Sequence, residues 1–333
     1  MFVVHDYPLA VVFCVITMLC WGSWANTRKL ADTGWRFELY YWDYSIGVLL
    51  VTLLLGLTMG SAGDQGRPFH LDVAQASSGS VASAMIGGAI FNLANIFLVA
   101  AIEIAGMAVA FPVGIGLALV IGVIVNYLAT PVGNVALLSA GVLLVTAAIV
   151  LDAIAYRRLP GGAGGVSTKG LILAVVSGVL MGAFYRFVAA AMYADPAHAD
   201  SGKVGPYAAV FIFAIGVFLS SFVWNTVAMK KPVVGAPVGF PQYFAAGLRT
   251  HLAGVLGGAV WGVGMCFSLI AAAPAGSAIS YGLGQGATMI AAFWGVCIWK
   301  EFDKAPAGTG KLISAMFACF IVGLTLVILA RAQ

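Results

Sequence analysis

The chain has 333 residues, of which 62% are hydrophobic and only 8% are charged, and its mean hydropathy is +1.03. Soluble domains carry roughly 25% charged residues, so this composition excludes a soluble protein and indicates an integral membrane protein. The net charge of +4 lies in the connections between apolar segments, where it bears on orientation and not on nucleic-acid binding. Residues 1–6 have neither a basic region nor a small-residue cleavage site, so we expect no cleaved signal peptide.

Ten apolar segments reach the length of about 20 residues that a helix needs to cross a bilayer. In chain order they are 8–27, 41–60, 81–101, 106–128, 135–156, 170–193, 207–227, 252–273, 276–299 and 311–330. A polar connection occupies residues 61–79, and the longest glycine-rich break, residues 157–169, marks the midpoint. We therefore predict an all-α integral membrane protein with ten transmembrane helices. Residues 1–156 form its first unit, 157–169 a linker and 170–333 its second unit.

The stretch 87–116 occurs a second time at 257–286, without a gap, at an offset of 170. The matching motifs are Gly87-Gly88 with Gly257-Gly258, Ala105-Gly106 with Ala275-Gly276, and Gly114-x-Gly116 with Gly284-x-Gly286. A shorter match relates residues 21–24 to 181–184 at an offset of 160. Five helices per copy is an odd number, so the second half must cross the membrane in the opposite sense. This predicts two inverted five-helix repeats, the arrangement in which carriers alternate between two gates around a midplane site.

Positive charge is concentrated on one side of the predicted bundle. The connections after helices 1, 3, 5, 7 and 9 carry Arg28, Lys29, Arg36, Arg157, Arg158, Lys169, Lys230, Lys231, Arg249, Lys300, Lys304 and Lys311. The other side carries Arg67, Lys203 and Arg331. The positive-inside rule therefore predicts both termini outside the plasma (inner) membrane and the linker 157–169 in the cytoplasm.

Polar side chains inside the apolar segments are the candidate solute-binding groups. Asn92 and Asn95 lie in the middle of the third segment, and Gln285 lies between two glycines in the ninth. Such amides often serve only to join helices, which is the alternative. We predict a site near the midplane, between the two repeated hairpins, with aromatic rings as flat surfaces. The candidate residues are Trp24, Asn26, Asn92, Asn95, Arg186, Trp261, Tyr281 and Gln285.

Arg186 is the only Lys or Arg in the interior of a predicted helix. A charge there costs at least ~2.5–3.5 kcal/mol on insertion scales, so it should have a partner or face water. A side chain that extends from near the helix end to the outer membrane surface is the alternative.

Asp43 and Glu103 are the candidate proton-coupling residues, because burial in a low-dielectric cavity favours the protonated form of a carboxyl group. Both lie at the predicted cytoplasmic ends of their helices. An equally good interpretation makes them rim carboxylates paired with Arg28, Lys29 or Arg36.

Several other sites are excluded. Ser167-Thr168 precede Lys169, the reverse of the phosphate-loop order. The Gly-x-Gly motifs lie inside membrane helices, so no dinucleotide fold is expected. The five cysteines show no metal spacing, and the four histidines are scattered. We therefore expect no enzyme activity, no cofactor, no metal and no nucleic-acid partner. No feature of the sequence indicates an oligomeric state.

The chain resembles the drug/metabolite transporter superfamily and, within it, the glucose/ribose porter and ureide permease branch. The motifs that carry the resemblance are Trp21-Gly22-Ser23-Trp24-Ala25-Asn26, Tyr41-Trp42-Asp43-Tyr44-Ser45, and Gly87-Gly88 with Asn126-Tyr127. The resemblance implies a secondary active transporter that takes up a small polar solute by alternating access, coupled to protons. The implied solute is a sugar, a ureide or a nucleobase.

A drug or metabolite exporter with the same fold is the alternative, because a fold does not decide function. The deepest helix charge is a cation, Arg186, which favours neutral or anionic cargo over cationic drugs.

Overall fold

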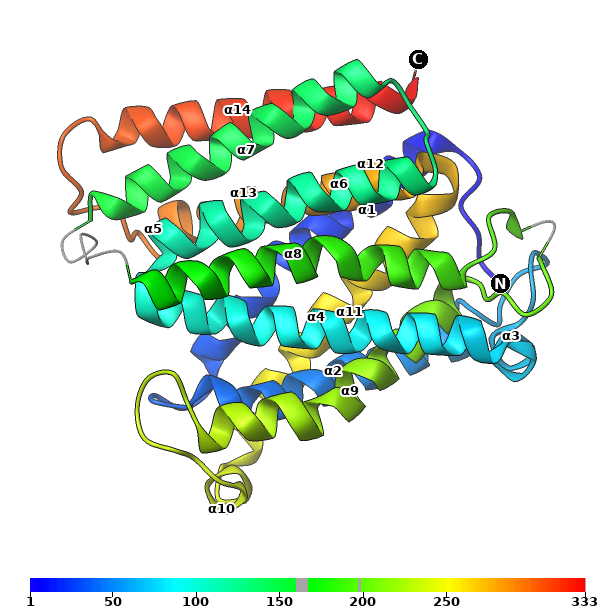
Figure 1. Ribbon diagram of the computed structural model, residues 1–333, viewed down its shortest axis with the longest axis horizontal. Helices are drawn as coiled ribbons and strands as arrows, with labels where there is room; N and C mark the ends of the chain where they lie inside the picture. The colour runs from blue at the N-terminus through cyan, green and yellow to red at the C-terminus, as the bar shows by residue number, and fades with distance from the viewer. Residues whose placement is uncertain (160–166, 197–198, 333) are drawn as a thin grey trace.

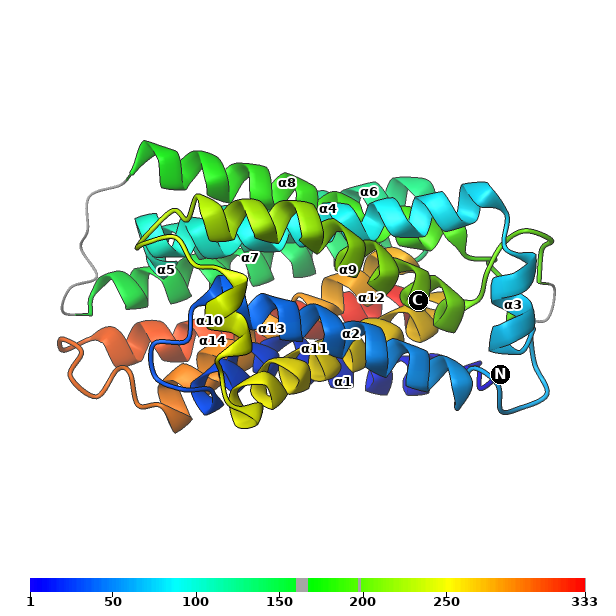
Figure 2. The same cartoon turned by 90° about the horizontal axis from the view of Figure 1, so that it is seen from below.

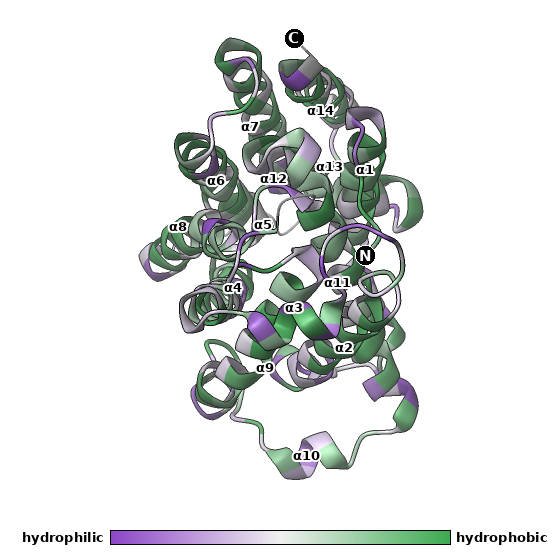
Figure 3. Ribbon diagram, turned by 90° about the vertical axis from the view of Figure 1, so that its right-hand side faces the viewer, coloured by the Kyte–Doolittle hydropathy of each residue, from purple (hydrophilic) through white to green (hydrophobic). Residues whose placement is uncertain are grey.

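The computed structural model describes residues 1–159, 167–196 and 199–332. Ten helices in this part of the chain are long and apolar enough to cross a membrane, which confirms the predicted number. They run side by side along the long axis of the molecule, and their outward faces are largely hydrophobic (Figures 1 and 3). The only β-pairing among the described residues is one isolated bridge between Met192 and Val204. The protein is an all-α integral membrane protein.

The spans divide into two sets of five in chain order. The first five are α1 (Tyr7–Ser23) continued by η1 (Trp24–Leu30), α2 (Phe37–Leu57), α4 (Ser78–Ala105), the run α5 (Met107–Ala110), η2 (Phe111–Ile115) and α6 (Gly116–Ala129), and α7 (Val135–Arg157). The second five are α8 (Thr168–Ala191), α9 (Pro206–Lys230), α11 (Leu248–Ala275), the run α12 (Ser277–Gly284), α13 (Ala287–Phe293) and η4 (Trp294–Ile298), and α14 (Thr309–Ala332). Residues 160–166 of the predicted linker lie outside the described residues.

Two short helices lie in connections for which the sequence predicted none: α3 (Phe69–Gln75) and α10 (Phe240–Phe244). Both are too short to be stable alone, so contacts with the rest of the chain hold them. The ring of Phe69 packs against Phe211 with a centroid distance of 5.4 Å, and Tyr243 of α10 hydrogen-bonds Asp43 of α2.

A single glycine makes the turn in each repeated hairpin. Gly106 ends α4 with φ 74°, and Gly276 ends α11 with φ 87°. A side chain at this backbone conformation is strained, so glycine is required there. The two positions are related by the offset of 170, so the repeat in the sequence produces the same turn twice.

Glycines also bring pairs of helices into backbone contact. A Cβ atom at Gly258 would collide with the carbonyl of Tyr44, and one at Gly88 would collide with the carbonyl of Phe213. The first contact joins α11 to α2, and the second joins α4 to α9. Small residues give membrane helices this close approach, which supplies van der Waals contact in place of a hydrophobic driving force.

Neighbouring helices follow one pattern in the two halves. Helix α1 packs on α11 as α8 packs on α4, and α2 packs on α11 as α9 packs on α4. Helices α7 and α14 pack on each other at one side of the bundle (Figure 1). Exchanging the helices of the first half for those of the second therefore leaves these contacts unchanged.

The two ends of the bundle differ in charge. One end carries both termini and α3, and we call it the terminal end (Figures 1 and 2). The other carries the last residues of η1 and α9 and the connections that follow η1, α9 and η4, with Arg28, Lys29, Lys230, Lys231 and Lys300, and we call it the basic end.

Candidate functional site

A cavity of about 350 Å³ extends from the middle of the bundle to the basic end. All its walls come from the middle or the basic half of their helices. Elements α1, η1, α2, α4, η2, α8, α11 and the broken helix α12–α13 contribute to it. Its lining residues are Trp21, Gly22, Trp24, Ala25, Arg28, Phe37, Tyr40, Phe91, Asn95, Leu98, Val99, Ile102, Glu103, Phe111, Ile115, Met181, Phe184, Trp261, Gln285, Ala287, Thr288 and Ala291.

Aromatic rings form the inner end of the cavity, in the middle of the bundle. Phe91 lies against Trp261 with a centroid distance of 4.3 Å and against Phe184 at 5.1 Å. Trp21 stacks on Trp261 at 5.7 Å with an angle of 10° between the rings. These four rings separate the cavity from the terminal half of the bundle. They present flat apolar surfaces to whatever occupies it.

Gln285 lies where the ninth span is broken. Helix α12 ends at Gly284 and α13 begins at Ala287, and the hydroxyl of Thr288 donates to the carbonyl of Gln285 at 2.9 Å. Gln285 is 8% exposed and lines the cavity, yet its side-chain amide forms no hydrogen bond with any described residue. A nearly buried amide needs partners, since leaving one unpaired costs about 1–3 kcal/mol. A molecule bound in the cavity can supply these hydrogen-bond partners to Gln285.

Asn95 supplies a second amide from α4, on a different wall. Its Nδ2 donates to the hydroxyl of Tyr41 at 3.3 Å, which fixes the orientation of the side chain, and the residue is 4% exposed. The side-chain oxygen has no partner among the described residues and belongs to a residue that lines the cavity. Asn95 and Gln285 together offer both donors and acceptors to a solute.

The charged lining residues lie at the mouth. Arg28 of η1 and Glu103 of α4 are exposed at the basic end, and the other lining residues carry no formal charge. An ion in the interior of the cavity would therefore lack a counter-charge, which favours a neutral solute there.

Four of the eight predicted binding residues line the cavity: Trp24, Asn95, Trp261 and Gln285. The other four do not. Asn92 faces α9, where its Nδ2 donates to Ser220 at 2.7 Å, and Asn26 accepts from Trp299 at 2.7 Å near the basic end. Tyr281 is fully buried and donates to the backbone carbonyls of Ala118 and Met181. Arg186 is half-buried on α8 and forms no ion pair with a described residue.

The two predicted proton-coupling residues have different surroundings. Glu103 lines the mouth of the cavity. Asp43 lies outside the cavity with its side chain 3% exposed, 2.9 Å from His251 Nδ1, and it accepts from the hydroxyl of Tyr243 at 2.6 Å. Neither forms an ion pair with Arg28, Lys29 or Arg36. Lys29 pairs with Glu301 at 3.7 Å, and Arg36 pairs with Glu38 at 2.5 Å. The cluster Asp43–Tyr243–His251 joins α2, α10 and α11.

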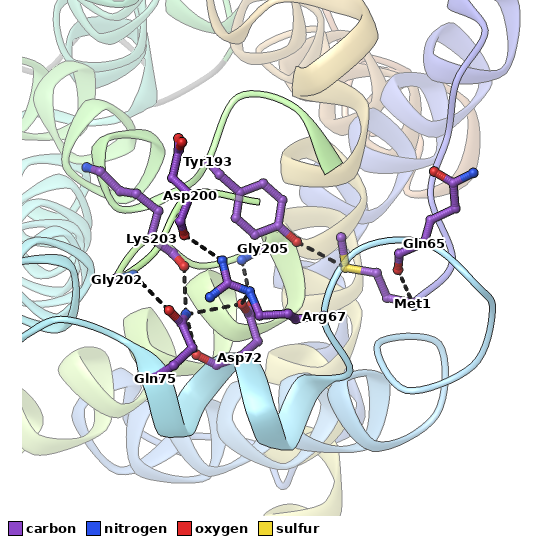
Figure 4. A network of polar contacts seen from close by, with 10 residues as sticks. All are labelled: Met1, Gln65, Arg67, Asp72, Gln75, Tyr193, Asp200, Gly202, Lys203 and Gly205. Carbon is purple, nitrogen blue, oxygen red and sulfur yellow. Dashed lines mark hydrogen bonds and ion pairs between the residues drawn. The ribbon is translucent and has the colours of Figure 1, made fainter. Parts of the chain in front are cut away.

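A network of polar contacts covers the terminal end (Figure 4). Asp72 of α3 is 1% exposed and accepts a hydrogen bond from the backbone of Gly205 at 2.5 Å, while Arg67 lies 3.5 Å away. Gln75 accepts from the backbone of Gly202 at 2.8 Å. Burial raises the pKa of the Asp72 carboxyl, although Gly205 and Arg67 both favour its charged form. The contacts tie the connection before α4 to the connection before α9. The bundle is therefore closed at the terminal end and hollow toward the basic end.

Sequence reasoning missed several lining residues, among them Trp21, Tyr40 and Phe111. Trp21 belongs to the same short motif as Trp24, and Phe111 is the repeat counterpart of Tyr281. The repeat could have identified Phe111, but no local signal distinguishes a cavity-lining aromatic from one packed in the core.

A ten-helix bundle with a cavity that reaches one end and is closed at the other is the arrangement expected of a membrane transport protein. The family model of ureide permeases matches residues 40–158 and 164–330, which is most of the chain. The chain belongs to the ureide permease family, whose named members are transporters rather than enzymes.

Two curated relatives match over nearly their whole length. Ureide permease 2 of Arabidopsis thaliana is 22% identical over 96% of this chain and 96% of that protein. Ureide permease 1 of the same plant is 20% identical over 97% of each chain. A crystal structure of another protein superposes with a TM-score of 0.62 over 98% of this chain and 99% of that chain. At 17% identity, this likeness shows the fold alone.

Proposed function

We propose that this protein is a secondary active carrier for the uptake of a ureide or a related nucleobase. The observation that carries the proposal is the pair of amides, Asn95 and Gln285, which face a cavity walled by aromatic rings. Ureides such as allantoin are small and neutral, and their urea groups both donate and accept hydrogen bonds. An amide side chain matches both roles, and the aromatic rings accommodate a flat solute. The names of the curated relatives support the same class of solute.

The carrier works by alternating access between two inverted five-helix units, 1–156 and 170–333, joined by the linker 157–169. Three features support this proposal: the repeat at an offset of 170, the matched turns at Gly106 and Gly276, and the matched helix contacts. Inverted repeats form one site at their interface and open it to either side in turn. The short motifs and the ten-helix arrangement also support membership of the drug/metabolite transporter superfamily.

The test is uptake into proteoliposomes that contain the purified protein. We expect accumulation of labelled allantoin, a ureide, with competition by uracil as a nucleobase and little competition by ribose as a sugar. Protein-free liposomes and an unrelated reconstituted carrier are the controls. Uptake of ribose with no response to allantoin or uracil would indicate a sugar carrier instead. Export of loaded compound without uptake would indicate the exporter function instead.

We propose that the basic end faces the cytoplasm of the plasma (inner) membrane, because of the excess of Lys and Arg in its connections. A reporter enzyme that is active only in the cytoplasm should therefore stay silent when fused after Gln333. The same reporter inserted in the linker 157–169 should be active. The reverse pattern of activities would overturn this orientation.

A further inference from the structure

Four polar side chains form a buried chain of contacts on the terminal side of the aromatic rings. The hydroxyls of Tyr185 and Ser268 lie 3.1 Å apart, and Ser268 lies 3.1 Å from the hydroxyl of Ser280. The thiol of Cys14 donates to Ser280 at 3.7 Å. These residues come from α8, α11, α12 and α1, and each is at most 1% exposed. Such contacts could simply join helices. Their positions within the repeat indicate another role.

The repeat relates Tyr185 and Ser268 to two residues that line the cavity. An offset of 170 makes Ser268 the counterpart of Leu98, and the offset of 160 makes Tyr185 the counterpart of Ala25. Leu98 and Ala25 both line the cavity on the basic side. On the basic side, the space between the two repeat-related positions is part of the cavity. On the terminal side, the corresponding positions are joined by the hydrogen bond between Tyr185 and Ser268. One half of the path is open and its counterpart is closed.

The chemistry of the two halves also differs. Ala25 and Leu98 have no polar side-chain atoms, so no hydrogen bond between these two side chains can close the basic half of the path. Tyr185 and Ser268 satisfy each other in the closed arrangement. Separating them leaves the Tyr185 hydroxyl without a partner in a low-dielectric region, whereas Ser268 keeps its contact with Ser280. An unpaired hydroxyl there is unfavourable unless another molecule binds it.

We propose that Tyr185 and Ser268 are a terminal-side binding position for the solute. They close this half of the path by bonding each other and contact the solute when the path opens there. The proposal rests on the alternating-access carrier proposed above. The ligand is the same neutral, hydrogen-bonding solute, which replaces the bond between the two hydroxyls. Opening toward the terminal end is therefore favoured when the solute is present.

The experiment compares two thiols at repeat-related positions. Ser268→Cys and Leu98→Cys are each placed in a variant whose five native cysteines are replaced by alanine, and reconstituted in sealed vesicles. A membrane-impermeant thiol reagent is added from outside. A third variant keeps only the exposed Cys297, near the basic end. Its reaction with the reagent shows whether the basic end faces the outside of the vesicles in each preparation. We expect Ser268→Cys to react only from the terminal side and Leu98→Cys only from the basic side.

Tyr185→Phe tests the hydrogen bond itself. The double variant Tyr185→Phe, Ser268→Ala should have a lower affinity for solute added on the terminal side. The single variant Tyr185→Phe should speed modification of the native Cys14 from the terminal side by about two- to ten-fold, because one stabilising hydrogen bond of the closed arrangement is lost. Tyr127→Phe is the matched control: its hydroxyl bonds the backbone of Gly133, away from the path, and the rate should not change.

The proposal is overturned if Ser268→Cys reacts from the same side as Leu98→Cys, or from neither side while the vesicles still transport. It is also overturned if Tyr185→Phe leaves Cys14 modification unchanged and the double variant Tyr185→Phe, Ser268→Ala keeps its full terminal-side affinity. A different failure concerns the proposed solute: if ureides are not carried, the two thiols should still react from opposite sides. Side-specific labelling therefore separates an error about the path from an error about the cargo.

Discussion

Gln285→Ala is expected to weaken binding of the solute by about ten-fold or more, with no change in the yield of folded protein. Gln285 is 8% exposed and lines the cavity, and its side-chain amide has no hydrogen-bond partner among the described residues. Losing a polar contact to a buried solute costs about 1–3 kcal/mol, and 1.4 kcal/mol corresponds to a ten-fold change in affinity. Because the amide has no intramolecular partner to lose, the stability of the fold should not change. Binding of labelled solute to purified protein measures the effect.

Two further variants separate hydrogen bonding from volume. Gln285→Met keeps the length of the side chain and removes the amide, so it should bind as weakly as Gln285→Ala. Ile115→Ala is the matched control at the repeat-related position, which also lines the cavity but has no polar atoms. It should change affinity much less. If Gln285→Ala and Asn95→Ala both bind at full strength, the solute binds elsewhere, and the repeat has located only the break in the helices.

Asp43→Asn is expected to abolish accumulation of solute driven by a pH gradient, while exchange of solute across the membrane continues. We propose Asp43 as the coupling-proton residue because it is a nearly buried carboxyl group inside a membrane-spanning helix. His251, whose side chain is 22% exposed, lies 2.9 Å from it and offers the proton a route to solvent. Asparagine keeps the shape of the side chain but cannot exchange a proton. Proteoliposome uptake with and without an imposed pH gradient distinguishes the two activities.

Asp43 lies outside the cavity, so its effect on the solute must be indirect, and control variants are needed. Its titration can reach the solute through α2, where Tyr40 lines the cavity one turn before Asp43, or through His251 and α11, where Trp261 lines it. Tyr243→Phe removes the hydrogen bond from α10 and keeps the carboxyl group, so gradient-driven accumulation should persist. Glu103→Gln tests the second candidate at the cavity mouth. Undiminished accumulation by Asp43→Asn, with an unchanged pH profile, would assign Asp43 a structural role and leave Glu103 as the candidate.

Much of the fold could be predicted because membrane spans depend on local composition. All ten predicted segments correspond to helices in the structure, with ends that differ by a few residues. The lipid bilayer requires each span to satisfy its own backbone hydrogen bonds, so twenty apolar residues in a row have few alternatives to a helix. Helices α3 and α10 were missed because contacts distant in sequence hold them, such as the contact between Phe69 and Phe211.

The candidate site was predicted in part, and the misses share one cause. Asn92 and Asn95 lie three residues apart on α4, so their side chains point about 60° apart around the helix. This difference turns Asn92 toward Ser220 of α9 and leaves Asn95 in the cavity wall. Which direction faces the cavity depends on how the neighbouring helices pack, and no pattern within α4 contains that information.

The sequence by itself determined that this is a ten-helix membrane protein with a repeated hairpin that turns at Gly106 and Gly276. It also singled out Gln285, because an amide between two glycines in an apolar segment is visible without a structure. Only the tertiary structure decided that the cavity opens toward the basic end and is closed by aromatic rings in the middle. It alone paired Asp43 with His251, which lies 208 residues away in the chain. Spans follow from the local cost of exposing backbone to lipid, whereas cavities and partners follow from which helix faces meet, a property of the whole bundle.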